Sequence, residues 1–271
     1  MDFYKWFFLE EGRTPEGLFS FAHLFACTLT LGIALFLAIF LAKRFKGNEK
    51  KQWLTILIAG ILIVAVQTFK IGVLVYQSTD TFWNVIIGNA PLYLCDMQIF
   101  IIPLAALTKG RFRGWCYDFV AIWGLLMGFF GNYFAGNIFP VHCVISHSAL
   151  NSITNHCISA FTALFIFVSG LNKMEKRDIP FTVGILVIYM TTALVIDYVD
   201  NHNFMFFFHG DGTPFTFFQN LVHDIKPLYQ LEIYILQCGY MVAFYYVYYW
   251  IKGMIAKKKA TKQVKEQPSG N

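Results

Sequence analysis

The chain has 271 residues, of which 57% are hydrophobic and only 14% are charged, and its formal net charge is +5. Soluble domains carry about 25% charged residues, so this composition predicts an integral membrane protein and argues against a soluble domain. The basic residues cluster in the segments between apolar stretches, so the positive charge does not indicate nucleic-acid binding.

Seven apolar segments are long enough, or nearly so, to cross a bilayer as helices, because a hydrocarbon core of about 30 Å needs about 20 helical residues. In chain order they are residues 19–42, 53–76, 82–107, 115–134, 145–169, 179–198 and 229–251. The sequence therefore predicts an all-α, polytopic membrane protein with seven transmembrane helices. Its predicted parts are an outer N-terminal segment 1–18, a seven-helix transmembrane domain 19–251 and a basic cytoplasmic tail 252–271.

The basic residues predict how this domain is oriented. Seventeen of the 21 lysines and arginines fall after segments 1, 3, 5 and 7, whereas the opposite side has only Lys5, Arg13 and Lys226. Cytoplasmic loops of membrane proteins carry the excess of lysine and arginine. We therefore expect the N-terminus outside, the C-terminus in the cytoplasm, and a multi-pass protein of the cell membrane.

The third segment carries an unexpected break, because Gly88-Asn89-Ala90-Pro91 interrupts it and polar residues follow. We expect a non-helical outer piece and a helix that begins near Pro91. On such a helix Pro91, Cys95, Gln98 and Ile102 share one face, and Asp96 is turned away by about 100°. Non-helical backbone at membrane depth is tolerated where it is buried in protein or faces a cavity, so the sequence predicts a cavity beside Cys95.

The fifth segment carries a stripe of small residues around one imidazole, formed by Ala149, Ser152, His156, Ser159 and Ala163. Small residues let another helix or a lipid chain approach closely. Cys95 and His156 each lie roughly 15 Å below the outer boundary at 1.5 Å per residue. Two groups on different helices at one depth can meet, which makes them a candidate pair.

Other polar side chains concentrate in the outer half of the predicted domain: Gln67, Lys70, Asp96, Gln98, His147, Asn151, Asp197, Asp200 and Glu232. Ionisable residues within spans are costly and are usually functional. We expect Lys70 to pair with Asp96 or Asp197. The Phe-rich connection 199–228 is expected to lie at, or fold into, the outer membrane surface, and its Asn203 either shapes this loop or contacts substrate.

A thiol and an imidazole together support nucleophilic chemistry, because a thiolate attacks acyl carbons and a histidine serves as base for the acceptor. A carboxylate can orient the imidazole, and the sequence does not choose among Asp96, Asp197 and Asp200 for this role. The competing interpretation is structural: a lone cysteine in an apolar helix acts more often as a small hydrophobe. No metal site is predicted, since the six cysteines show no CxxC pairing and His142 and His147 are five residues apart.

Four stretches together resemble a known family. They are "PLYLCDMQIFIIPLAALTKGR", "VAIWGLLMGFFGN", "NHCISAFTALFIFVSGL" and "DYVDNHNFMFF". The chain resembles, over roughly residues 50–250, the YwaF-type bacterial integral membrane family, to which a mammalian transmembrane acyltransferase of ether-phospholipid remodelling also belongs. The resemblance implies a Cys–His pair that moves a fatty acyl chain between phospholipids without a soluble cofactor.

The resemblance also implies residue roles. The family's Pro-x-x-x-Cys element corresponds to Pro91 and Cys95, and its fifth-span histidine best matches His156. Bacterial members commonly have "LSHG" where this chain has "TNHC", and a second Ser-His at 146–147 leaves His147 as an alternative base.

The leading hypothesis is a membrane lipid acyltransferase in which Cys95 carries the acyl chain as a thioester and His156 is the base. Asp96 or Asp197 would hold the imidazole, and Asn89 or Gln98 would help stabilise the oxyanion. Lys70, Ser152, His147 and Asn203 complete the candidate substrate-binding residues. The expected partners are phospholipids and lysolipids, with no cofactor and no nucleic acid. The alternatives are a small-solute or ion transporter with an outward-facing polar pocket, or a non-catalytic membrane scaffold.

Overall fold

The computed structural model describes residues 2–211, 213 and 215–266. Across these residues it is all-helical, as predicted, and contains no strand. The α-helices are α1 (Phe3–Phe8), α2 (Phe21–Arg44), α3 (Glu49–Gln77), α4 (Phe82–Gly88), α5 (Met97–Leu107), α6 (Gly110–Tyr133), α7 (His147–Ser169), α8 (Ile179–Asp200), α9 (Phe215–Leu221) and α10 (Lys226–Glu266). Two short 3₁₀ helices, η1 (Lys176–Asp178) and η2 (Phe204–Phe206), flank α8.

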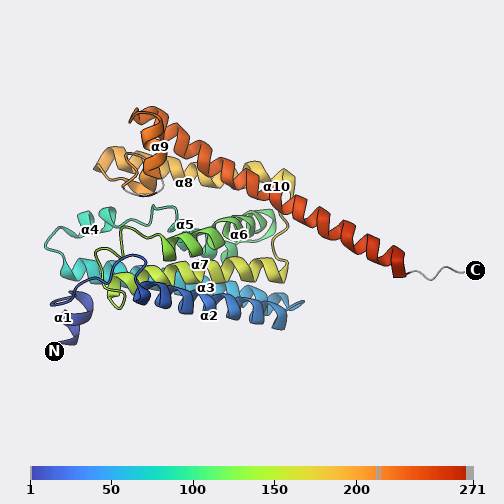
Figure 1. The fold of residues 1–271 in the computed structure, drawn as a ribbon, viewed down its shortest axis with the longest axis horizontal. Coiled ribbons are helices and arrows are strands. Elements are labelled where there is room, and N and C mark those ends of the chain that lie inside the picture. Colours follow the sequence, from blue (N-terminus) through green and yellow to red (C-terminus); the bar gives the residue numbers. More distant parts are fainter. Residues whose placement is uncertain (1, 212, 214, 267–271) are drawn as a thin grey trace, which may run out of the picture.

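Helix α7 is the centre of the bundle, because it packs against α2, α3 and α6 (Figure 1). Helix α5 packs between α3 and α6, and α8 pairs with α10. The short helices α1, α4 and α9 gather at one end of the molecule, at the left in Figure 1, which is the predicted outer end. Helix α10 runs well beyond the bundle at the opposite end.

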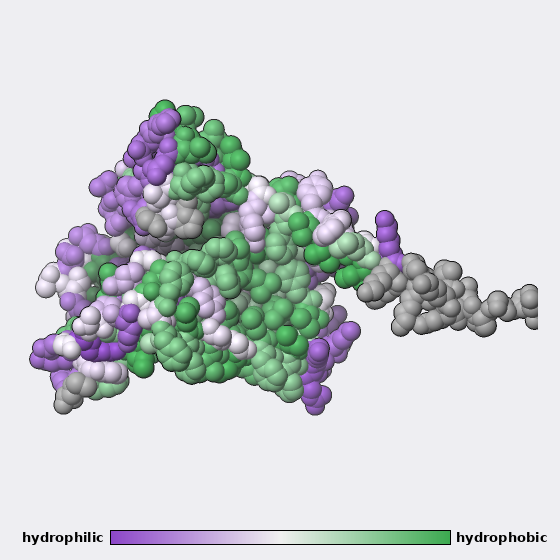
Figure 2. All heavy atoms as spheres, viewed as in Figure 1, coloured by the Kyte–Doolittle hydropathy of each residue, from purple (hydrophilic) through white to green (hydrophobic). Residues whose placement is uncertain are grey.

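Apolar and polar residues occupy separate zones of the surface, as they do in membrane proteins. Figure 2 shows a broad hydrophobic band between two hydrophilic ends. Helix α2 contributes a row of exposed apolar side chains to the surface, among them Phe25, Leu29, Ile33 and Phe36. Large exposed apolar surface of this extent is stable only against lipid or another protein.

Five helical segments of the described chain are long and apolar enough to cross a membrane: Phe21–Arg44, Glu49–Gln77, Gly110–Tyr133, His147–Ser169 and Lys176–Asp200. Each coincides with a predicted span to within a few residues. The third predicted span is divided into α4 and the short apolar helix α5, and the seventh lies within the 41-residue α10. The count of seven spans and the orientation of the termini stay predictions.

The break in the third segment is present, but two details of its prediction were wrong. The outer piece is itself helical (α4), and α5 begins at Met97 rather than near Pro91. Residues 89–96 are a succession of turns, in which Asp96 N–H donates to the Tyr93 carbonyl. The Pro91 carbonyl accepts a hydrogen bond from the Tyr189 hydroxyl of α8 instead of continuing a helix. Pro91 and Cys95 therefore share no helical face with Gln98, because neither lies on α5.

The small-residue stripe of α7 serves helix packing. Gly124 on α6 faces it so closely that a Cβ added there would lie 2.6 Å from the Ser159 carbonyl oxygen. A Cβ at Gly124 would lie 2.8 Å from that of Ala163. Small residues at both helix surfaces allow this approach, which is the common packing mode of membrane helices. The close approach expected from the sequence is thus made by α6.

Hydrogen bonds hold the N-terminal segment against the loop that precedes α7. Both carboxylate oxygens of Glu10 accept hydrogen bonds, one from His142 Nδ1 at 2.7 Å and one from the Cys143 amide at 2.5 Å. Arg13 donates to the Ile145 carbonyl at 2.7 Å. Partial burial acts to raise the Glu10 pKa, but these hydrogen bonds to its ionised form outweigh it and hold the pKa below its ordinary value.

The Phe-rich connection after α8 folds into the protein. Phe204, Met205 and Phe207 are almost completely buried, and the Phe204 ring meets Tyr93 of the break at a centroid distance of 5.4 Å. These residues cover the break from the α8 side, and the expectation that the loop lies at, or folds into, the outer membrane surface stays a prediction. The loop therefore helps to enclose the segment that carries Cys95.

Candidate functional site

Cys95 lies in the last turn of the break, directly before the first residues of α5. Its Sγ is 3.7 Å from Asp96 Oδ1, and the thiol is the donor of this contact. Asp96 occupies the N-cap position of α5 but makes no capping hydrogen bond with its side chain. The carboxylate is therefore directed to the thiol and to α7 rather than to the helix that it precedes.

Asn155 of α7 holds the other side of this carboxylate. Its Nδ2 donates to Asp96 Oδ1 at 3.3 Å, so one oxygen receives both the Cys95 thiol and the Asn155 amide. Asn155 is buried, and its Oδ1 has no hydrogen-bond partner among the described residues. Sequence reasoning missed Asn155, although its position next to His156 in the middle of an apolar segment was a usable signal.

The imidazole of His156 faces α6, where Gly131 makes room for it. A Cβ added at Gly131 would lie 2.1 Å from His156 Cε1 and 2.3 Å from Nε2. His156 is buried, and its Nδ1 has no partner among the residues described. No hydrogen bond joins Cys95 and His156 in the described chain, so the thiol reaches α7 through Asp96 and Asn155.

Lys70 of α3 is the cation of this region. It lies within electrostatic range of Cys95, Asp96, His147 and His156. No carboxylate of the described residues comes within 4.0 Å of its ammonium group, so the direct ion pair expected with Asp96 or Asp197 does not form. Lys70 thus acts electrostatically on the cysteine and on both histidines without forming a direct ion pair in the described chain.

Two further predicted residues lie buried nearby without partners. Gln98 on α5 is fully buried, and neither its Oε1 nor its Nε2 has a hydrogen-bond partner within the described chain. His147, the first residue of α7, contacts the rings of Phe8 and Phe69, and its Nε2 is likewise unpartnered among the described residues. Buried polar groups are normally satisfied, so unpaired groups mark places where water or a ligand belongs. Ser152 is partly exposed on α7.

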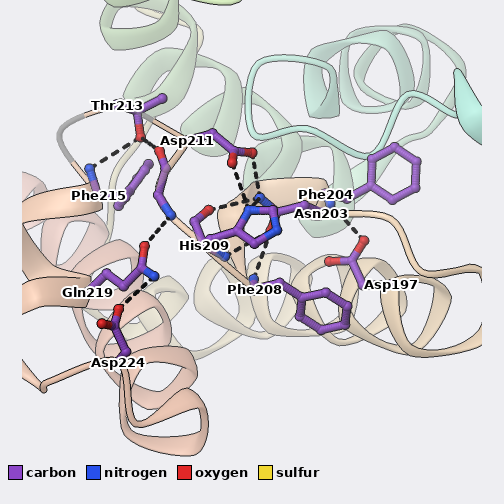
Figure 3. Close-up of polar contacts among 11 residues, drawn as sticks. Asp197, Asn203, Phe204, Phe208, His209, Asp211, Thr213, Phe215, Gln219 and Asp224 are labelled. Atoms are coloured by element: carbon purple, nitrogen blue, oxygen red, sulfur yellow. Dashed lines mark hydrogen bonds and ion pairs between the residues drawn. The ribbon is translucent and has the colours of Figure 1, made fainter.

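Asp197 and Asn203 organise the outer loop (Figure 3). The buried Asp197 accepts a hydrogen bond from the Phe204 amide at 2.7 Å. Asn203 Nδ2 contacts His209 and Asp211, and its Oδ1 accepts from the amides of Phe208 and His209. These contacts hold the loop in place, although Asp197 Oδ2 is buried without a hydrogen-bond partner among the described residues.

Asn89 lies at the outer rim of the break. Its Nδ2 donates to the Val85 carbonyl at 3.0 Å, and the residue lines a cavity of about 490 Å³. The other lining residues are Leu74, Ser78, Asp80, Asn84, Val85, Gly88, Asp200 and His202. This cavity opens outward of Cys95 and touches neither Cys95 nor His156.

The described residues contain no group of three or more His, Cys, Asp or Glu side chains arranged to hold a metal ion. A sequence model of the TMEM164 family matches residues 18–249 of the chain. No curated protein and no solved structure matches the chain. The YwaF-type and acyltransferase resemblance is not tested by these comparisons and stays a prediction.

Proposed function

The chain belongs to the TMEM164 family, and from this premise of a membrane-embedded protein we propose that it transfers fatty acyl chains between membrane lipids through Cys95. The observation that carries the proposal is the contact of the Cys95 thiol with Asp96, which Asn155 fixes from α7. A cysteine that only filled space in an apolar helix would need no carboxylate at hydrogen-bond distance.

In the first step the Cys95 sulfur attacks the ester carbonyl of a donor phospholipid. The carbon–sulfur bond forms, the ester carbon–oxygen bond breaks, and the thiol proton leaves through Asp96 to the departing lysolipid alkoxide. The products are an acyl thioester on Cys95 and a lysolipid with a free hydroxyl. Gln98, whose amide has no protein partner, is the candidate donor to the oxyanion.

In the second step the hydroxyl of an acceptor lipid attacks the thioester. His156 takes the hydroxyl proton, the new ester forms, and the proton returns to the Cys95 sulfur, so that the enzyme is regenerated. Asp96 is favoured over Asp197 as the carboxylate of this site, because the Cys95 thiol donates to Asp96, whereas no hydrogen bond joins Asp197 to Cys95 or His156 in the described chain. Phospholipids and lysolipids are the partners of this reaction, and the cell membrane is its proposed location.

The test follows a labelled acyl chain between two lipids in vesicles that contain the purified protein. Cys95→Ser should reduce transfer to the uncatalysed rate. The matched control is Cys238→Ser, because Cys238 is also a partly exposed free cysteine within the helical bundle. Transfer that continues at the wild-type rate in Cys95→Ser contradicts the proposal.

A further inference from the structure

Within the described chain, three side chains in the outer halves of α3 and α7 carry a nitrogen with no hydrogen-bond or ion-pair partner. Gln67 and His147 are more than nine-tenths buried, yet Gln67 Nε2 and His147 Nε2 make no hydrogen bond within the described residues. Lys70 follows Gln67 by three positions and so lies on the same face of α3. Its ammonium group forms no ion pair in the described chain. A partly buried cation beside two buried nitrogens that lack hydrogen-bond partners can receive an anion.

The carboxylates of this region are engaged elsewhere. Asp96 accepts from Cys95 and Asn155, and Glu10 accepts from His142 and from a backbone amide. Lys70 is within electrostatic range of His147, which begins α7. The N-terminus of a helix carries a partial positive charge and favours anions. Lys70 and the N-terminus of α7 therefore both contribute positive potential near His147, and the Asp96 carboxylate within range of Lys70 opposes it.

The depths of these residues fit a lipid that enters from the outer leaflet. Lys70 lies seven residues before the end of α3, about 10 Å below its outer end at 1.5 Å per residue. His147 lies at the outer end of α7, and His156 is nine residues, about 14 Å, deeper. In a phospholipid the phosphate lies outward of the acyl esters. A phosphate at Lys70 and His147 would thus leave the esters deeper in the bundle, on the side of His156.

We propose that Gln67, Lys70 and His147 form a phosphate seat, a binding site for the phosphate group of a lipid headgroup. This inference rests on the proposed function, since the phosphate seat would place the donor ester near Cys95. Free inorganic phosphate offers the same chemistry, and the experiment separates the two sources.

The experiment measures which lipid the purified full-length protein retains in native mass spectrometry. Dioleoylphosphatidylcholine and dioleoylglycerol are offered together, because they have the same chains and differ in the phosphate-bearing headgroup. The wild type should prefer the phospholipid, and Lys70→Met and Gln67→Leu should each reduce this preference about tenfold, as expected for a lost charge-assisted hydrogen bond. Lys70→Arg should retain it. Thermal unfolding of each variant checks that it is folded.

The matched control is Lys226→Met, since Lys226 is also a lysine of the predicted outer side but lies over the Phe208 ring, 3.4 Å from its centroid. It should leave the preference unchanged. A wild-type preference in Lys70→Met, or an equal loss in Lys226→Met, overturns the phosphate seat.

A second measurement adds inorganic phosphate alone. If inorganic phosphate stabilises the wild type against heat but does not stabilise Lys70→Met, the phosphate seat binds the free anion. If the phospholipid has an effect and inorganic phosphate has none, the phosphate seat binds the lipid headgroup. Cys95→Ser should keep the lipid preference. If the wild type prefers the phospholipid but transfers no acyl chain, the proposed function is refuted and the phosphate seat is supported.

Discussion

Replacement of Gly131 by alanine tests how the α6–α7 interface places the imidazole of His156. The added methyl group would lie 2.1 Å from Cε1 and 2.4 Å from Nδ1 of this ring. Non-bonded carbon atoms prefer about 3.5–4.0 Å, so the ring must retreat by more than about 1 Å or the two helices must separate. Overpacking of this kind costs about 1–3 kcal/mol of stability. A displacement of about 1 Å in a reacting group lowers its rate about 10²-fold.

The assay combines thermal unfolding with the acyl-transfer rate. Gly114→Ala is the control on the same helix, because a Cβ there meets nothing within 4 Å, and alanine is favoured over glycine within helices by about 0.5–1 kcal/mol. In a His156→Ala background the added methyl group has room, so Gly131→Ala should lower the stability very little. The two substitutions should therefore show a coupling free energy of about 1–3 kcal/mol in a double-mutant cycle. Equal behaviour of Gly131→Ala and Gly114→Ala, or strict additivity with His156→Ala, would refute the reasoning.

Three more changes probe the contacts around the site. Asn155→Ala removes the amide donor to Asp96 and should lower the free energy of unfolding by about 1–3 kcal/mol; an unchanged unfolding temperature contradicts the contact. Hydrogen bonds lower the pKa of Glu10 in the folded protein. The ionised carboxylate therefore stabilises docking of the N-terminal segment at any pH above the pKa of the unfolded chain, about 4.3. This stabilisation is lost as the pH falls through that pKa and then through the lower pKa of the folded protein. Limited proteolysis of residues 1–18 should rise with that fall, and Glu10→Gln should make cleavage independent of pH. Asn203→Ala removes the centre of the outer-loop network and should make residues 201–211 at least about tenfold more sensitive to protease, whereas unchanged cleavage would show that the loop holds without it.

Hydropathy predicted most of the helices well, because a long apolar segment that must cross a bilayer has few alternatives to a helix. The break in the third segment was also predictable from Gly88 to Pro91. Its extent was not, since Pro91 is compatible with the first turn of a helix. What keeps residues 89–96 out of a helix includes contacts with distant elements, namely the hydrogen bond from Tyr189 and the packing of Phe204 on Tyr93.

The sequence predicted which residues belong to the candidate site better than it predicted which of them contact one another. A small-residue stripe indicates that something approaches α7 closely, but the stripe does not say that α6 does so or that Gly131 receives His156. The link from Cys95 through Asp96 to Asn155 depends on the turn before α5. The sequence pattern predicts instead a helix that begins near Pro91, whereas α5 begins at Met97. Long-range packing, rather than local propensity, decides these contacts.

The central claim is that Cys95 carries the acyl chain as a thioester. Intact mass spectrometry of the protein after incubation with a donor phospholipid measures this directly. We expect an added mass equal to one acyl chain, located by peptide mapping on Cys95, removed by neutral hydroxylamine and absent from Cys95→Ser. Acyl transfer in the wild type without such an adduct, or an adduct that persists in Cys95→Ser, would contradict the account.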